Sequence, residues 1–331
     1  MRPFLYERPE TIDEVFALLD RAAPESSKLL AGGTDLLPLM KDEIVAPNEL
    51  IDIKRLVEID DQIELTADGL RIGALATLAE IENNPFVRAD YAALSQAAGL
   101  AASPQLRNMA TIGGNLLQRP RCWYFRDSEV HCWLKGGEEC FAVEGENQLH
   151  AIFDGSPCHA VHPSDLAAAL LMFGASVVAR GATHERTIAI EDFFTLPKAD
   201  HRIEHMLRPD EMIVAITLPS RPTTARSVYV KAMDRAVWAF ALIGVAALLD
   251  VQEGRIAEAR LVLSGAAPIP WRVAKADSLL LNSTPGPKIF GDAARLAMDG
   301  AEPLSQNAYK LPLAEALILR ALAAAAESPA T

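Results

Sequence analysis

Short apolar runs alternate with segments of helical periodicity along the first part of the chain. The apolar runs predict strands at 27–30, 50–53, 63–66 and 70–73. Apolar residues at helical spacing, preceded in the first case by Thr11 as an N-cap, predict helices at 12–19, 78–83 and 91–102. This mixture of strands and helices predicts an α/β or α+β architecture for the N-terminal half.

The periodicity disappears at about residue 119 and returns at about residue 164. The stretch between them is rich in cysteine, histidine, glycine and aromatic residues and has no amphipathic pattern. A helix is predicted again at 164–173 and a strand at 175–180. The aperiodic stretch therefore indicates a long loop between two parts of a folded domain.

Two prolines mark a change further along the chain. Pro219 and Pro222 interrupt the pattern and predict a boundary between a domain at 1–222 and a second domain at 223–331. Segments of strand and helix character alternate in the second domain, at 227–231, 239–250, 256–263, 270–281 and 312–325. The longest apolar run in this part, 238–249, predicts a core helix.

Acidic side chains outnumber basic ones, 44 against 31, which gives a formal net charge of −13 and a pI near 5.0. Such a chain is repelled by phosphate backbones and anionic lipid, so nucleic acid and membrane surfaces are not expected as partners. No run of about 20 apolar residues predicts a membrane span. The first residues show no signal-peptide pattern, so a cytoplasmic protein is expected. The location would be periplasmic if the signal of a partner exports the folded complex.

Two glycine loops of similar composition lie about 80 residues apart. The first is Ala31-Gly32-Gly33-Thr34-Asp35 and the second is Ala110-Thr111-Ile112-Gly113-Gly114-Asn115-Leu116. Glycines allow backbone N–H groups to approach a pyrophosphate, and hydroxyl and amide side chains hydrogen-bond phosphate or ribose oxygens. The pair indicates a dinucleotide site, whereas either loop alone is more often a plain turn. Neither a G-x-G-x-x-G nor a Walker A motif is present, so Rossmann and P-loop folds are not indicated.

All four cysteines, Cys122, Cys132, Cys140 and Cys158, lie in the aperiodic stretch. Four unrelated free thiols would rarely cluster in this way, so a shared function is indicated. Two disulfides are disfavoured in a chain without a secretory signal. Four thiolates can hold a structural zinc ion or an iron–sulfur cluster. The gaps of nine, seven and seventeen residues contain no C-x₂₋₄-C pair of the kind usual for zinc, which favours a larger cluster and leaves zinc as the alternative.

Several motifs in one collinear order resemble those of the flavoprotein subunits of molybdenum hydroxylases of the xanthine dehydrogenase and aldehyde oxidoreductase type. They are the segments 30–37 and 107–116, His162-Pro163-Ser164-Asp165-Leu166, Leu207-x-Pro209-Asp210-Glu211, Lys231-x-x-x-Arg235 and Asn307-Ala308-Tyr309-Lys310. Each motif alone is common. Their order from the first glycine loop to the C-terminus makes the resemblance specific.

The resemblance implies an α+β fold: an FAD-binding unit of the vanillyl-alcohol-oxidase (PCMH) type with subdomains at 1–58 and 59–222, then a smaller α+β C-terminal domain. It also implies which residues contact FAD, namely Leu30, Ala31, Gly32, Gly33, Thr34, Asp35, Leu36, Thr111, Gly113, Gly114, Asn115, Leu116, Ser164, Asp165, Leu207 and Lys231. Lys231 would lie near the isoalloxazine ring, where a positive charge favours reduced flavin. No catalytic residue is implied, because another subunit would bind the substrate.

Residues 119–161 depart from the family pattern, in which most flavoprotein subunits run directly from Gly-Gly-Asn-Leu to the Ser-Asp segment. The segments 117–119 (Leu-Gln-Arg) and 122–127 (Cys-Trp-Tyr-Phe-Arg-Asp) resemble an insertion of bacterial molybdenum aldehyde oxidoreductases that carries a 4Fe–4S cluster. A related insertion occurs in 4-hydroxybenzoyl-CoA reductases. The resemblance therefore implies that Cys122, Cys132, Cys140 and Cys158 hold a 4Fe–4S cluster.

The implied function is that of the FAD- and 4Fe–4S-containing electron-transfer subunit of a molybdenum-dependent aldehyde oxidoreductase. Its partners would be a small subunit with two 2Fe–2S clusters, which supplies electrons, and a large subunit with molybdopterin. An external acceptor would take the electrons from FAD. The alternatives are a subunit of a 4-hydroxybenzoyl-CoA reductase-like or xanthine dehydrogenase-like enzyme, a stand-alone FAD oxidase, and a zinc-stapled interaction protein without a redox role.

Overall fold

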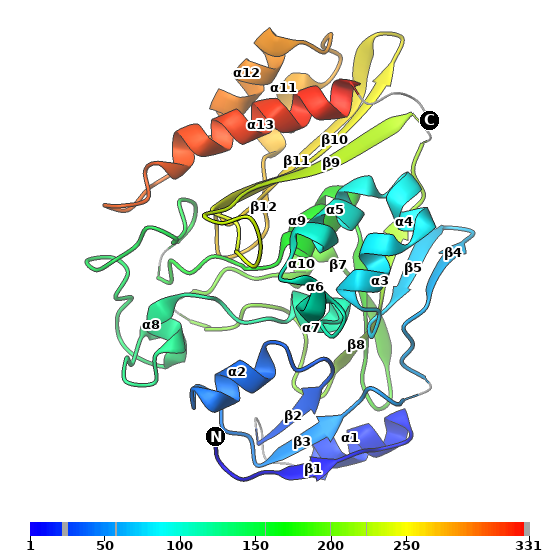
Figure 1. Ribbon diagram of the computed structural model, residues 1–331, viewed down its shortest axis with the longest axis vertical. Helices are drawn as coiled ribbons and strands as arrows, with labels where there is room; N and C mark the ends of the chain where they lie inside the picture. The colour runs from blue at the N-terminus through cyan, green and yellow to red at the C-terminus, as the bar shows by residue number, and fades with distance from the viewer. Residues whose placement is uncertain (22–25, 57, 156, 199, 223, 328–331) are drawn as a thin grey trace.

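The computed structural model describes residues 1–21, 26–56, 58–155, 157–198, 200–222 and 224–327. Three sheets are formed within these ranges. Figure 1 shows them stacked along the long axis of the molecule, with the N-terminal sheet at one end and the C-terminal sheet at the other. None of the helices in the described ranges is long and apolar enough to cross a membrane.

The N-terminal sheet is parallel, with the strand order β1-β3-β2. Its elements are β1 (Leu5–Glu7), α1 (Ile12–Arg21), β2 (Ser27–Leu30), α2 (Leu36–Lys41) and β3 (Glu49–Asp52). The first glycine loop connects β2 to α2. It therefore lies at the carboxyl edge of a parallel sheet, which is where α/β folds usually bind ligands.

The middle sheet is antiparallel, with the order β4-β5-β8-β6-β7. Its strands are β4 (Ile63–Thr66), β5 (Gly69–Gly73), β6 (Ser176–Arg180), β7 (Glu185–Ala189) and β8 (Met212–Pro219). The helices of this part are α3 (Leu78–Asn83), α4 (Pro85–Asp90), α5 (Ala92–Leu100), α6 (Pro104–Arg107), α7 (Ile112–Leu116), α9 (Asp165–Phe173) and α10 (Ile190–Phe193). Helix α9 is buried along its whole length, so it forms the centre of the main core.

The cysteine-bearing stretch runs between α7 and α9. Its regular structure consists of α8 (Trp123–Arg126) and one turn of 3₁₀-helix, η1 (Trp133–Lys135). In Figure 1 it lies at the flank of the molecule, with α2 below it and the C-terminal domain above it. The absence of periodicity in the sequence is thus explained, because this stretch folds as a loop around a small apolar cluster that it shares with Leu39 of α2.

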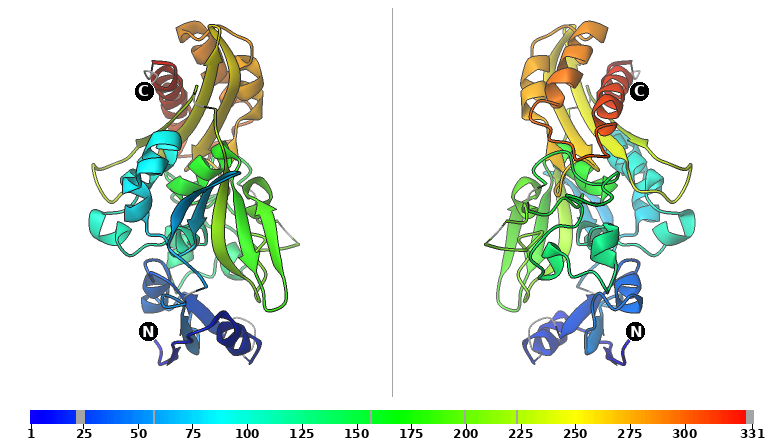
Figure 2. Two further views of the ribbon diagram at one scale, coloured as in Figure 1. Left: turned by 90° about the vertical axis from the view of Figure 1, so that its right-hand side faces the viewer. Right: turned by 90° about the vertical axis from the view of Figure 1, so that its left-hand side faces the viewer.

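The C-terminal sheet is antiparallel, with the order β12-β11-β10-β9. Its elements are β9 (Ala225–Ala232), β10 (Ile243–Gln252), β11 (Arg255–Ser264), β12 (Trp271–Arg272), α11 (Ala274–Leu280), α12 (Pro287–Ala297) and α13 (Lys310–Glu327). Helices α11 to α13 cover one face of this sheet, as Figure 2 shows, and α5 and α9 pack against the other. The sheet therefore joins the two domains.

The core helix predicted at 238–249 is wrong, because Ile243–Gln252 forms the strand β10. Ala246 and Leu248 belong to the main core, whereas Val245, Ala247 and Leu249 belong to the C-terminal core. A strand that is buried on both faces carries apolar residues at every position, so its sequence resembles that of a buried helix. Helix α12 was not predicted at all.

Candidate functional site

The two glycine loops lie against each other in space. An added Cβ at Gly32 would stand 1.8 Å from the carbonyl oxygen of Met109, just before the second loop, so only glycine permits this approach. Gly33 has a φ of +71°, in the left-handed region that favours glycine. The loops that the sequence assigns to one ligand are therefore adjacent.

The backbone amides of the two loops have different surroundings. In the described chain no hydrogen bond is found from the N–H groups of Gly32, Gly33 or Thr34, so these donors are available to an anionic ligand. In the second loop, the Gly113 N–H donates to the Ala74 carbonyl at 3.0 Å and the Gly114 N–H donates to the Thr111 hydroxyl at 3.2 Å. The first loop thus offers free donors, whereas the protein itself holds the second loop.

Ser164 connects the second loop to helix α9. Its hydroxyl donates to the side-chain carbonyl of Asn115 and accepts a hydrogen bond from the Ala167 N–H at 3.0 Å, as the N-cap of α9. Ser164 is buried. Its observed role is to hold the second loop beside the start of α9.

Asp165 and Lys231 form a buried ion pair between α9 and β9. The Lys231 Nζ lies 2.7 Å from the Asp165 Oδ2 and also donates to the Leu100 carbonyl at 3.1 Å. The Tyr229 hydroxyl donates to the Asp165 Oδ1 at 2.6 Å. Burial, reinforced by the Asp165 carboxylate, raises the pKa of Tyr229 well above its ordinary value, so the phenol stays a donor. Lys231 and Asp165, which the resemblance both assigns to the flavin site, therefore form an ion pair with each other.

A pocket lies beside this ion pair. Its lining comes from the cysteine-bearing insertion, from the Ser-Asp segment and from two loops of the C-terminal domain: Arg121, Val161, His162, Pro163, Asp165, Phe240, Ala241, Ser264 and Gly265. Arg121 stacks over the ring of Phe240, with its guanidinium carbon 4.9 Å from the ring centroid. Four stretches of the chain, at 121, 161–165, 240–241 and 264–265, therefore meet at one place.

Asp35 contacts the insertion. Its carboxylate lies 2.7 Å from the Arg121 guanidinium and 2.8 Å from that of Arg126, and it accepts the backbone N–H of Arg119 at 2.8 Å. Although Asp35 is the N-cap of α2, it makes no side-chain cap bond, because its oxygens face these partners. The sequence alone did not predict these ion pairs of Asp35, because the positions of arginines along a chain do not show which carboxylate they will contact.

The stretch around Leu207 is held by a buried carboxylate. Glu211 accepts hydrogen bonds from the Arg186 side chain at 2.7 and 2.8 Å and from the Arg208 backbone N–H at 2.9 Å. The Arg186 bonds, as the first cause, lower the pKa of Glu211 to about 2. Leu207 packs against the main core. Its predicted position beside the isoalloxazine ring stays a prediction.

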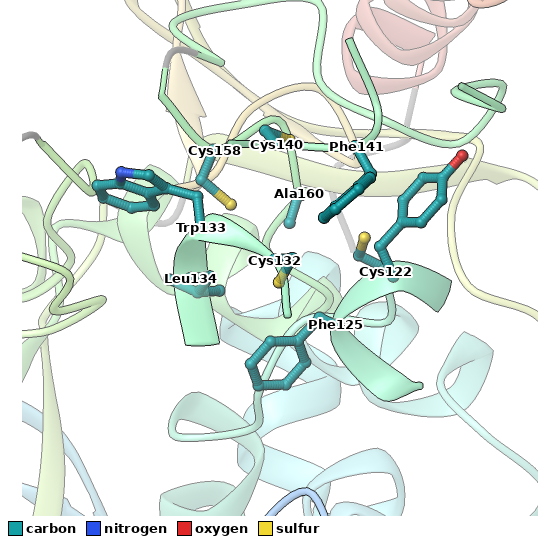
Figure 3. A pocket seen from close by; sticks show the side chains of 10 residues that line it. Cys122, Phe125, Cys132, Trp133, Leu134, Cys140, Phe141, Cys158 and Ala160 are labelled. Atoms are coloured by element: carbon teal, nitrogen blue, oxygen red, sulfur yellow. The ribbon is translucent and has the colours of Figure 1, made fainter. Parts of the chain in front are cut away.

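The four cysteines line one pocket. The other residues that line it are almost all apolar or aromatic: Tyr124, Phe125, Trp133, Leu134, Phe141 and Ala160. Figure 3 shows the cysteine side chains around a common space. Burial raises the pKa of the Cys122 thiol to about 11 and raises that of Cys158 well above its ordinary value. In the absence of a bound metal these two groups are therefore protonated thiols near neutral pH.

The cysteines are free thiols, without disulfides. Across the described residues, no group of three or more histidine, cysteine or acidic side chains is arranged to hold a single metal ion. The predicted ligands thus share one pocket without converging on one point.

Two family models divide the chain between them. The FAD binding domain in molybdopterin dehydrogenase matches residues 2–221, and the CO dehydrogenase flavoprotein C-terminal domain matches residues 228–325. These matches define a flavin-binding subunit of an oxidoreductase. The chain belongs to the FAD-binding subunits of the molybdenum hydroxylase family. The predicted family, α+β fold class and oxidoreductase class are confirmed.

Relatives and solved structures agree with this membership. The aldehyde oxidoreductase FAD-binding subunit PaoB of Escherichia coli K12 is 42% identical over 332 residues, which covers 98% of this chain and 99% of the relative. The carbon monoxide dehydrogenase medium chain of Hydrogenophaga pseudoflava is 27% identical, with 97% and 96% covered. A solved structure of carbon monoxide dehydrogenase from Hydrogenophaga pseudoflava matches with a TM-score of 0.77 at 27% identity and covers 98% of this chain and 97% of its own.

Proposed function

We propose that this chain is the FAD- and 4Fe–4S-containing electron-transfer subunit of a molybdenum-dependent aldehyde oxidoreductase. One observation carries the proposal: four thiols line one pocket in an insertion whose arginines bind the first glycine loop through Asp35. The relative named as an aldehyde oxidoreductase subunit supports the aldehyde branch, because it is 42% identical over almost the whole chain.

The residues present fit FAD. The first glycine loop, Ala31–Asp35, offers free backbone donors for the two phosphates, and the second loop lies directly against it and is held by hydrogen bonds within the protein. Ser164 holds the second loop through its hydrogen bond to Asn115. The Asp165–Lys231 ion pair connects strand β9 of the C-terminal domain to the start of α9, next to this loop. When bound, FAD exchanges electrons with its redox partners, while the protein sets its position and electrostatic surroundings.

The cysteine pocket fits a multi-iron cluster better than a zinc ion. Four thiolates around one zinc ion, each at about 2.3 Å, would lie within roughly 4 Å of one another. In a 4Fe–4S cluster each cysteine binds a different iron, so the four sulfur atoms are farther apart. The spacing of the cysteines favours the second arrangement, because it contains no C-x₂₋₄-C pair of the kind usual for zinc, and the shared pocket supplies all four thiols. The aromatic lining would keep water away from a cluster.

The proposed partners are a small subunit with two 2Fe–2S clusters and a large subunit with molybdopterin. Relatives named as a medium chain of carbon monoxide dehydrogenase and as a subunit of a 6-hydroxypseudooxynicotine dehydrogenase complex support assembly with other chains. Substrate oxidation would take place on the large subunit, and this chain would pass the electrons on to an external acceptor.

The decisive measurement is the content of iron, zinc and acid-labile sulfide in the full chain, purified anaerobically. About four iron and four sulfide per chain are expected. Replacing any one of the four cysteines by serine should bleach the broad absorption beneath the flavin bands, while FAD is largely retained. One zinc and no sulfide would overturn the cluster and leave a flavoprotein with a structural zinc ion.

The substrate class is tested on the complete complex. Reduction of the flavin by aromatic or aliphatic aldehydes is expected, and xanthine should not reduce it. Flavin reduction by xanthine, or electron flow toward an aromatic acyl-CoA, would replace the aldehyde proposal by the xanthine dehydrogenase-like or the 4-hydroxybenzoyl-CoA reductase-like alternative.

A further inference from the structure

A histidine approaches one of the four thiols. The Nε2 of His150 lies 3.2 Å from the Sγ of Cys122, at the wall of the cysteine pocket. His150 is buried, with 2% of its surface exposed. Its ring packs edge-on against the Trp123 ring, with the centroids 5.1 Å apart, and lies 6.1 Å from the Tyr124 ring. The contact is therefore enclosed by aromatic groups and shielded from solvent.

The backbone of His150 is fixed by the C-terminal domain. The buried ammonium group of Lys310 donates to the carbonyls of Leu149 at 3.1 Å, His150 at 2.9 Å and Gly265 at 2.8 Å. The side-chain amide of Asn307 donates to the carbonyls of His150 and Ala151, both at 3.1 Å. Two completely buried side chains, Lys310 at the first position of α13 and Asn307 just before the helix, thus hold the segment that carries the histidine.

The chemistry of the pair determines the direction of the hydrogen bond. A metal-bound thiolate has no proton and can only accept, so the His150 Nε2 must be the donor. The other ring nitrogen, Nδ1, is buried and has no partner in the part of the chain that the structure describes. A ring with its proton on Nε2 leaves Nδ1 as an unprotonated acceptor. This arrangement matches the observed surroundings of both nitrogens.

We propose that His150 is a positioning residue that acts through Cys122: its Nε2–H donates to the cluster thiolate and raises the reduction potential of the cluster. Hydrogen bonds to the sulfur atoms are among the factors that set such potentials, because they withdraw negative charge and so stabilise the reduced form. This inference rests on the 4Fe–4S cluster proposed above. It adds to that proposal a specific residue, His150, and the sign of its effect on the reduction potential of the cluster.

The test compares His150→Phe, which removes the donor, with His150→Gln, which keeps an N–H near the same place. Redox titration of the purified chain, followed by the EPR signal of the reduced cluster, measures the potential. In His150→Phe the equilibrium should move about tenfold toward the oxidised cluster, a fall of about 59 mV for a one-electron couple. His150→Gln should stay close to the wild type. His184→Phe, at a histidine that contacts Glu211 rather than a cysteine, is the control and should not move the potential.

Two further measurements separate the possible failures. Iron and sulfide analysis of the wild type tests the cluster itself, and a lack of both would overturn the proposed function together with this inference. Intact iron and sulfide in His150→Phe with an unchanged potential would overturn the role of His150 alone. If the Phe variant loses the cluster, pulsed EPR of wild-type protein labelled with ¹⁵N-histidine decides the question. A weak nitrogen coupling that His150→Gln lacks supports the bond, and no coupling refutes it.

Discussion

The carboxylate of Asp35 lies 2.8 Å from the guanidinium of Arg126, and this contact joins the first glycine loop to the cysteine-bearing insertion. Arg121 and the backbone of Arg119 bind the same carboxylate. Asp35 and Arg126 are both largely buried, so their attraction is weakly screened by solvent. The insertion is thus attached at the loop proposed to hold the phosphates of FAD, and the two proposed cofactor sites are mechanically coupled.

Replacing Asp35 by alanine should loosen the insertion. Two arginines would lose a partly buried partner, which costs roughly 1–3 kcal/mol. Hydrogen exchange of residues 119–161 should become faster, and the thermal midpoint should fall by several degrees. Asp42→Ala, which removes an exposed carboxylate at the other end of α2, is the control and should leave both unchanged. Unchanged exchange in the Asp35 variant would show that the arginine contacts do not hold the insertion.

Valine at the glycine loops should remove the flavin. Gly33→Val forces a branched side chain into a positive φ and within 3.0 Å of Leu37. At Gly114, the only atom of the described residues found within 4 Å of an added Cβ is the Thr111 hydroxyl oxygen, at 3.1 Å, a tight contact that requires this side chain to shift. The φ of Gly114 is not positive, so the Gly114→Val variant should strain the backbone less than Gly33→Val does.

Flavin content per chain, read from the released flavin after acid precipitation, should fall by roughly tenfold or more in both variants, which corresponds to about 1.4 kcal/mol of binding free energy or more. Gly291→Val in helix α12 is the control, because it adds the same side chain far from both loops. Normal flavin in both loop variants would place the FAD site elsewhere.

Much of the fold could be predicted because local patterns match the observed elements. The strand at Ser27–Leu30 and the helix at Leu78–Asn83, with Thr77 and Glu80 as a capping box, are determined by nearby residues. The strand β10 could not be predicted, since its two buried faces belong to two different cores. Burial on both faces is a property of the whole domain, and no local pattern distinguishes it from a helix.

The residues of the candidate site also fall into those that the sequence singles out and those whose contacts only the structure shows. The glycines and cysteines could be singled out because few residue types can replace them. The partners of Asp35 and Asp165 could not, because charged residues are frequent and their pairing depends on how distant segments pack. The Lys310 motif was noted from the resemblance, but the contacts of Lys310 with two carbonyls of the insertion and with the Gly265 carbonyl became visible only in the structure.

Removing the charge of Lys231 should be costly. Lys231→Met would leave Asp165 buried with Tyr229 as its remaining partner in the described network, and an unpaired buried charge costs roughly 3–5 kcal/mol. The variant should unfold at much lower urea concentration and should bind flavin poorly. Tyr229→Phe should have a smaller effect, since the ion pair remains. Lys275→Met, which breaks an exposed pair with Asp299, should be nearly neutral. Equal effects at positions 231 and 275 would contradict a structural role of the buried pair.

Glu211 should make stability depend on acid pH. Its pKa is lowered to about 2 by the hydrogen bonds from Arg186, whereas the unfolded chain has an ordinary carboxyl with a pKa near 4.5. Below about pH 5 the unfolded state therefore binds more protons than the folded state, and the stability that Glu211 contributes is lost as the pH falls toward 2. The shift corresponds to roughly 3 kcal/mol at neutral pH.

Glu211→Gln removes this contribution, so the gap in unfolding free energy between wild type and variant should be largest at pH 7 and should shrink by pH 3.5. Urea unfolding at pH 7, 5 and 3.5 measures the gap. The neighbouring Asp210→Asn, at an exposed carboxylate, is the matched control for the loss of one acidic charge. A gap that stays constant from pH 7 to pH 3.5 would mean that Glu211 has the same pKa in both states. The stretch that carries Leu207 would then be held by packing rather than by this buried carboxylate.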